Sequence, residues 1–162
     1  MTITTVRADQ VIDLPAVMGA GVPVELQGVV VVAVEGDVDL YSGPDLRQAL
    51  AEVLSAPVDG QAVEQPGAGG DASPGADGPP DPVRAVVVDL SEVEFIDSYA
   101  VGVLVQGHHL AHRSGRAYAL VATHPMIHKL FEITGLVRVL PLHATVATAV
   151  HELHPVEEDA RR

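Results

Sequence analysis

The pair Asp97-Ser98 is the position at which residue type and setting most clearly support chemistry. It follows the β-branched run Ala85–Leu90 and precedes an apolar segment with helical spacing, Tyr99 to Arg113. A serine at such a junction can cap the first turn of the helix through its hydroxyl. The same place favours an anion, because unpaired amides and the helix dipole point toward it. Ser98 is therefore a candidate for a helix cap or for phosphorylation, which would add about −1.5 to −2 charges.

The histidines are a second group with possible chemistry, and all eight lie between His108 and His154. His108 and His112 are four residues apart, as are His124 and His128, so the members of each pair would share a helix face. A His-Glu-x-x-His motif is absent and the sequence offers no obvious third ligand. We expect solvated or partner-facing histidines and no metal or cofactor, with a zinc or nickel site as the alternative.

Other catalytic patterns are excluded or weak. The absence of cysteine excludes thiol catalysis, thiolate zinc sites and disulfides. A P-loop needs Gly-Lys-Ser/Thr, but the single lysine, Lys129, follows a histidine. The glycine-rich segment 67–72 matches a relaxed dinucleotide pattern without a strand before it or a helix after it. A Ser-His-Asp set can be assembled, but Gly-x-Ser-x-Gly is absent, so we expect no hydrolase activity.

The elements that must position Asp97-Ser98 alternate between strands and helices. This alternation predicts an α/β domain with a mixed, mainly parallel sheet of four to five strands and about four helices. The expected strands are 22–27, 29–34, 85–90, 117–122 and 137–140. The expected helices cover 44–54, 99–113, 125–134 and 144–153.

The 162 residues suit one domain with an interruption. Residues 57–82 contain six prolines, six glycines and five acids but no base, which is typical of a flexible insertion. We assign residues 1–21 to an N-terminal extension, 22–152 to the domain that this insertion interrupts, and 153–162 to a tail. No signal peptide or membrane-spanning run is evident, so a cytoplasmic protein is expected.

Charge limits the range of partners. Acids outnumber bases 22 to 9, giving a formal charge of −13. A nucleic-acid binder or a protein that docks on anionic lipid needs a basic surface, so we expect neither kind of partner. Residues 1–96 hold 16 acids and 3 bases, so the excess precedes Ser98. We therefore expect a partner with compensating basic residues and binding that weakens as salt rises.

Several ordered motifs carry a family resemblance. The run from Val86 to Ser98, Val-Val-Val-Asp-Leu-Ser-Glu-Val-Glu-Phe-Ile-Asp-Ser, followed by Val-Gly-Val-Leu, resembles the central motif of the STAS domain family. Gly36-Asp-Val-Asp39 with Pro44-Asp-Leu46 resembles the family's Gly-x-x-Asp turn and first helix. Residues 128–136 resemble its Leu-x-x-Thr-Gly-Leu segment. The likeness extends over about residues 22–152, apart from the insertion.

This resemblance implies a non-enzymatic anti-sigma factor antagonist. It would bind an anti-sigma factor that is also a serine kinase, and so free a sigma factor for transcription. Phosphorylation of the serine after the aspartate, here Ser98, would end the binding, and a phosphatase is a further expected partner. The expected partner-binding residues are Asp37, Asp39, Asp97, Ser98, Tyr99 and Ala100. Asp37 and Asp39 have a second interpretation as caps of turn amides.

The sequence departs from the family pattern after the serine, where small residues are usual and Tyr99-Ala100 stands here. We expect Tyr99 to pack or to contact the partner, with phosphorylation of Tyr99 as the lesser alternative. Tyr99 and the insertion favour a second functional hypothesis, a scaffold or sensor module in a larger signalling complex. A metal-dependent enzyme built on the histidines is the third hypothesis.

Overall fold

The fold is built on a five-stranded sheet with the order β1-β2-β3-β4-β5. The structure is a computed structural model that describes residues 1–7, 28–55 and 83–153. The strands are β1 (Thr2–Arg7), β2 (Val29–Glu35), β3 (Ala85–Glu92), β4 (Ala117–Val121) and β5 (Leu142–His143). The edge strand β1 is antiparallel to β2, and the other neighbours pair in parallel. The sequence prediction of a mixed, mainly parallel α/β sheet is confirmed.

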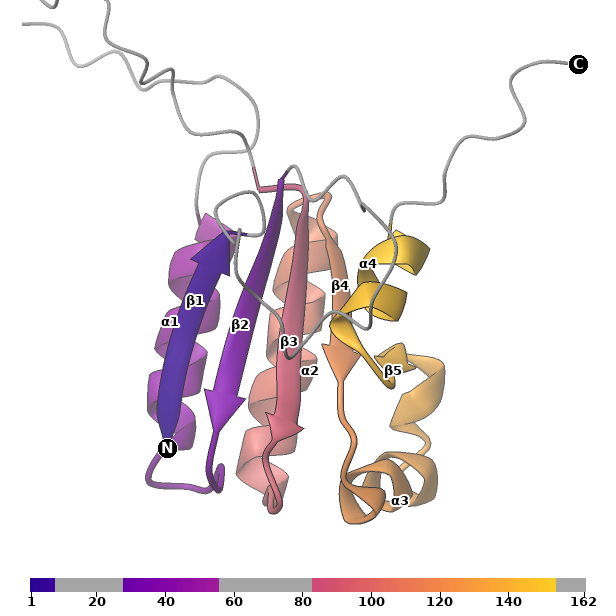
Figure 1. Ribbon diagram of the computed structural model, residues 1–162. Helices are drawn as coiled ribbons and strands as arrows, with labels where there is room; N and C mark the ends of the chain where they lie inside the picture. Colours follow the sequence, from indigo (N-terminus) through magenta and orange to yellow (C-terminus); the bar gives the residue numbers. More distant parts are fainter. Residues whose placement is uncertain (8–27, 56–82, 154–162) are drawn as a thin grey trace, which may run out of the picture.

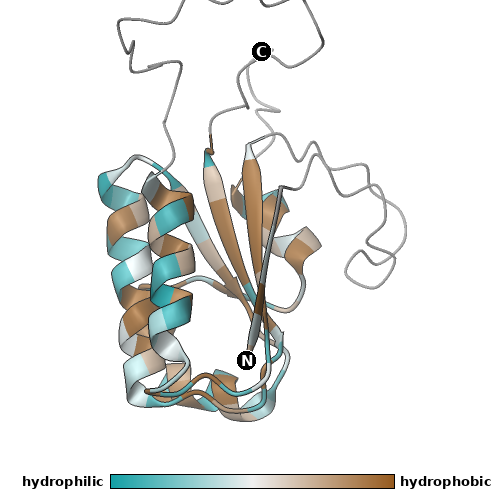
Figure 2. Cartoon of the chain, turned by 90° about the vertical axis from the view of Figure 1, so that its left-hand side faces the viewer, coloured by the Kyte–Doolittle hydropathy of each residue, from teal (hydrophilic) through white to brown (hydrophobic). Residues whose placement is uncertain are grey.

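Helices cover both faces of this sheet. They are α1 (Gly43–Ser55), α2 (Ser98–Arg113), α3 (Pro125–Ile133) and α4 (Val146–Leu153), with a 3₁₀ turn, η2, at Leu136–Arg138. Figure 1 shows α1 and α2 side by side behind the sheet, and Figure 2 shows them together on one face. Helix α4 packs on the opposite face, so the molecule has three layers.

The central strands are buried on both faces, which explains their nearly continuous valine runs. In β2, Val30, Val32 and Val34 face a core shared with α1, α2 and α3. Val29 and Val31 face the smaller core beneath α4. Because successive side chains of a strand point to opposite faces, one apolar run supplies both cores.

The parallel connections fix where the functional residues meet. Strands β2 and β3 both end at the lower end of the sheet in Figure 1, where α1 and α2 begin. The turn that contains Asp97-Ser98 therefore lies beside the turn that contains Asp39. An isolated parallel bridge, Val38 to Ile96, continues the pairing of β2 and β3 into these turns.

Two segments differ from the sequence prediction. The expected strand 137–140 is a 3₁₀ turn that runs into an irregular segment, and the strand follows at Leu142–His143. Gly135 ends α3 with a φ of 70°, and Leu140 then donates to the carbonyl of Leu136. A short apolar run does not by itself distinguish a strand from a tight turn.

The sheet also begins earlier than expected, because β1 lies inside the segment assigned to an extension. The segment gives little strand signal in the sequence, because Thr2, Thr4 and Thr5 are polar and exposed and Ile3 is only partly buried. The expected strand 22–27, the insertion 57–82 and residues 154–162 of the tail lie outside the described residues.

Candidate functional site

Asp97 is the residue that joins the two turns. Its backbone is extended, and its Oδ1 accepts a 2.8 Å hydrogen bond from the amide of Ala100, which makes Asp97 the N-cap of α2. Its Oδ2 accepts a 2.9 Å bond from the amide of Leu40, 57 residues away in sequence. One carboxylate therefore satisfies a helix amide and an amide of the neighbouring turn.

Ser98 occupies the first helical position and is exposed. The cap interpretation of Ser98 is wrong, because the Asp97 carboxylate holds that role. An N-cap residue keeps a non-helical backbone, but the chain is already helical at Ser98, one residue earlier than that interpretation requires. The Ser98 hydroxyl therefore stands at a helix N-terminus without serving as its cap.

Asp39 organises the turn between β2 and α1. Its Oδ1 accepts from the amide of Tyr41 at 2.9 Å, and from the amide and hydroxyl of Ser42 at 3.0 Å each. These hydrogen bonds, above all the one from the Ser42 amide, hold the pKa of Asp39 below its usual value of 3.8. Asp39 therefore caps turn amides, and Asp37 beside it is exposed while its carbonyl accepts from the Ser42 hydroxyl.

Backbone bonds fasten this turn to the start of α2. The amide of Val38 donates to the carbonyl of Phe95 at 3.0 Å, and the amide of Asp97 donates to the carbonyl of Val38 at 3.1 Å. The two turns thus form one surface, although nearly 60 residues of sequence separate them.

Tyr99 and Ala100 point inward to different degrees. Tyr99 is half-buried and packs over Gly43, where an added Cβ would lie 2.6 Å from its ring. The tyrosine ring therefore rests on the first residue of α1 and leaves Ser98 exposed. The sequence predicts that Ala100 contacts the partner. Its side chain is fully buried in the core and therefore has no surface that a partner could contact.

Three large apolar side chains surround the turn and were not identified from the sequence. Leu40 is 58% exposed, Tyr41 89% and Phe95 53%. Leu40 and Phe95 are tied to the turn by the bonds to Asp97 and Val38. The sequence could have indicated that these side chains are exposed, because each lies near acids, glycine or proline just outside a predicted helix or strand. Exposed apolar groups gathered around a rigid turn are typical of a protein-binding surface.

Comparison with known proteins places this geometry in a family. A family model described as the STAS domain matches residues 22–149, which is most of the chain. The chain belongs to the STAS domain family. The resemblance identified from the sequence motifs is thereby confirmed.

Named relatives of this STAS domain are anti-sigma factor antagonists. An anti-sigma F factor antagonist from Paenibacillus polymyxa is 28% identical over 71 residues, which are 44% of this chain and 61% of that protein. A putative anti-sigma factor antagonist from Thermotoga maritima is 33% identical over 40% of this chain and 57% of that protein. The chain spans about three fifths of the length of these curated relatives.

Solved structures share the fold of this STAS domain. An anti-sigma factor antagonist from Mycobacterium paratuberculosis has a TM-score of 0.60 at 24% identity, covering 94% of this chain and 95% of that one. A sulfate transporter family protein from Wolinella succinogenes has a TM-score of 0.54 at 12% identity, covering 79% and 86%. At these identities the likeness shows the fold alone, and the fold occurs in proteins of different names.

The histidines of this STAS domain have separate structural surroundings. Within residues 1–7, 28–55 and 83–153, no group of three or more histidine and acidic side chains could hold a metal ion. His124 lies before α3 and its Nδ1 accepts from the amide of Met126 at 3.3 Å, whereas His128 Nε2 lies 2.6 Å from the Ala122 carbonyl. Burial, helped by His109 and His112, lowers the pKa of His108.

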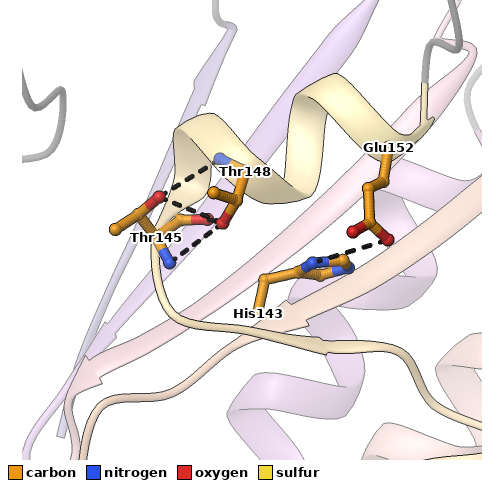
Figure 3. Close-up of polar contacts among 4 residues, drawn as sticks. All are labelled: His143, Thr145, Thr148 and Glu152. Carbon is orange, nitrogen blue, oxygen red and sulfur yellow. Dashed lines mark hydrogen bonds and ion pairs between the residues drawn. The ribbon is translucent and has the colours of Figure 1, made fainter.

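His143 belongs to the attachment of α4. Its Nδ1 lies 3.9 Å from Glu152 Oε2, near the end of the helix (Figure 3). At the start of the helix, the amide of Thr148 donates to the Thr145 hydroxyl at 3.1 Å. The amide of Thr145 donates to the Thr148 hydroxyl at 3.3 Å. The threonine bonds stabilise the start of α4, the His143–Glu152 contact links its end to β5, and Val146, Ala149 and Val150 pack it on the sheet.

The opposite end of the sheet is organised by Arg116, which is only 5% exposed. Its Nε donates to the Val83 carbonyl at 3.0 Å, and its Nη1 donates to the Leu54 carbonyl. Leu54 and Val83 flank the segment that contains residues 57–82, so one arginine holds both sides of it. The end of α1 and the start of β3 therefore meet at the end of the sheet away from Ser98 (Figure 1). Among the helices described, none is both long and apolar enough to cross a membrane.

Proposed function

We propose that this STAS domain is an anti-sigma factor antagonist that binds an anti-sigma factor with serine-kinase activity and is switched off by phosphorylation of Ser98. The observation that carries the proposal is that Ser98 is exposed at the first position of α2 while Asp97 caps the helix. A hydroxyl with no capping duty can accept a phosphate without the loss of the cap. The names of the relatives describe antagonists of anti-sigma factors, which supports the choice of partner.

The phosphate would act through its charge. Placed at a helix N-terminus, it would be locally tolerated by the dipole of α2. It would also stand beside the carboxylate of Asp97, on a surface that already includes Asp37 and Asp39. An added charge of about −1.5 to −2 there would make the surface that the partner binds more negative while leaving the fold intact.

The proposed contact surface combines charge with apolar area. It consists of Asp37, Asp39, Asp97, Ser98 and the exposed part of Tyr99, together with Leu40, Tyr41 and Phe95. Ala100 contributes its backbone amide to the cap and no surface. The apolar members supply binding that salt does not screen, so salt should weaken the complex without abolishing it.

The cellular part of the proposal follows from this binding. The chain would act without catalysis, in the cytoplasm, and would free a sigma factor by occupying the anti-sigma factor. A phosphatase that removes the phosphate from Ser98 would restore binding.

The test is phosphotransfer. Anti-sigma factors with kinase activity from the source organism are purified singly and incubated with ATP and the wild type, Ser98→Ala or Ser91→Ala. We expect label in the wild type and in Ser91→Ala, whose half-buried hydroxyl bonds to Asp89, and none in Ser98→Ala. Equal labelling of Ser98→Ala and the wild type would exclude the assignment to Ser98.

A scaffold or sensor module in a larger complex is the second candidate. The observation in its favour is the shared fold with a sulfate transporter family protein, together with Tyr99 in place of a small residue. Mass measurement after purification of native complexes discriminates between the two. A stable assembly of many subunits would support the scaffold, and a small complex that Ser98→Asp weakens would support the switch.

A further inference from the structure

Helix α3 has an outward face with unusual composition. Met126 is 65% exposed and Ile133 75%, and their spacing of seven positions returns the side chain to the same face after about two turns. The exposed Lys129 lies between them on this face. The inward face is formed by Ile127 and Phe131, which are almost fully buried, so the helix does not need Met126 or Ile133 for its own packing.

The segment after α3 continues this surface. The 3₁₀ turn η2 adds Val137, 41% exposed, and the exposed Arg138, and Val139 beyond it is 45% exposed. The surface therefore has an apolar centre with two cations, and its one anion is Glu132. We call the set Met126, Lys129, Ile133, Val137 and Arg138 the α3 patch.

The α3 patch lies at the same end of the sheet as Ser98. Both views of the molecule place α3 at the end where α1 and α2 begin (Figures 1 and 2). A hydrogen bond of 3.1 Å from the Thr123 hydroxyl to the Ser91 carbonyl fastens the start of α3 to the end of β3. The start of α3 is thereby held beside the end of the strand that leads into the Ser98 turn.

The two surfaces carry opposite charge. Asp37, Asp39 and Asp97 lie on the two joined turns at Ser98, whereas Lys129 and Arg138 accompany the exposed apolar groups on α3 and η2. This end of the molecule therefore has an acidic surface at the Ser98 turn and a basic surface on α3 and η2, and both include exposed apolar side chains.

We propose that the α3 patch is a second contact for the anti-sigma factor, and that the partner meets it with apolar side chains flanked by acids. This inference rests on the proposed function and adds the chemistry of the partner, which would be basic over the Ser98 turn and acidic over α3. Such complementarity fixes the orientation of a complex and suppresses wrong partners. Phosphorylation of Ser98 removes only the first contact.

The experiment measures binding to the anti-sigma factor that the wild type binds among those purified singly. The variants are Ile133→Ser, Lys129→Glu and Ser98→Asp. The matched controls are Leu110→Ser, 37% exposed near the end of α2, and Arg84→Glu, exposed just before β3, both at the opposite end of the sheet. All substituted side chains are solvent-exposed, and circular dichroism verifies their folding.

We expect Ile133→Ser and Lys129→Glu each to raise the Kd by about tenfold, with both controls within about twofold. Loss of affinity in Ser98→Asp alone would overturn the α3 contact and leave the proposed switch in place. Loss in the two α3 variants alone would support the contact and contradict the switch. Wild-type affinity in all variants, or no binding by any anti-sigma factor, would overturn both.

Discussion

The two ends of the sheet satisfy their backbone groups in opposite ways. At the end that holds Ser98, helices begin, and the carboxylates of Asp39 and Asp97 accept hydrogen bonds from amides. At the other end α1 finishes, and the buried guanidinium of Arg116 donates to carbonyls. Helix N-termini favour anions and C-termini favour cations, so the charge at each end follows from the direction of the helices.

The two ends of the sheet also differ in how much of their polar and apolar side chains is exposed to solvent. The two turns at Ser98 leave the serine and three large apolar side chains in solvent, whereas Arg116 is 5% exposed. Groups that are buried and fully bonded serve stability, and exposed groups on a rigid frame are available to a partner. Substitutions at the Arg116 end should therefore change stability, and substitutions at the Ser98 end should change binding more than stability.

The largest expected effect comes from Arg116→Met. Removing the guanidinium leaves the carbonyls of Leu54 and Val83 without this donor, and we expect a loss of about 3 kcal/mol in the free energy of unfolding. Urea unfolding measures it, with the exposed Arg113→Met as the matched control. A loss below about 0.5 kcal/mol, the usual size for a surface substitution, would contradict the assigned role.

Asp97→Ala should have the next largest effect. It removes both the cap of α2 and the bond to Leu40, and we expect a loss of about 1 to 2 kcal/mol. Asp45→Ala, an exposed acid in the first turn of α1, is the control. Amide hydrogen exchange should show faster exchange at Leu40 and Ala100, and unchanged exchange at both amides would argue against the bridging carboxylate.

Gly43→Ala tests the contact between the starts of the two helices. The new methyl would lie 2.6 Å from the Tyr99 ring, so the ring must move, and we expect a loss of about 1 to 2 kcal/mol. Combining it with Tyr99→Ala should relieve the clash. A double-mutant cycle in urea measures the coupling, and simple additivity of the two losses would rule out the packing described.

The smallest expected effect concerns pH. Because burial and the neighbouring histidines lower the pKa of His108, the unfolded chain takes up a proton near pH 6.5 where the folded chain resists it. Stability should therefore fall as the pH drops below about 6.5, and His108→Gln should reduce that fall. Urea unfolding at about pH 7.5 and pH 5.5 compares the two proteins. An identical fall in both would assign the pH dependence to other groups.

Much of the architecture could be predicted from local pattern. The valine runs of β2 and β3 indicated strands buried on both faces, and helical spacing with proline or glycine at the ends indicated α2 and α3. Local pattern also predicted that a strand gives way to a helix near Asp97-Ser98, which made Ser98 a candidate for a cap or a phosphate, and the family resemblance implied the regulatory role. These features follow from the period of apolar residues and from the φ that proline and glycine permit.

The remaining features depend on contacts between distant segments. Which of Asp97 and Ser98 caps α2 depends on where the backbone becomes helical. The bond from Leu40 to Asp97 and the packing of Tyr99 on Gly43 join residues that only the parallel pairing of β2 and β3 brings together. The sequence by itself determined the elements and their order. Tertiary structure decided which polar groups are satisfied and which side chains remain exposed, because both depend on what the rest of the chain places beside them.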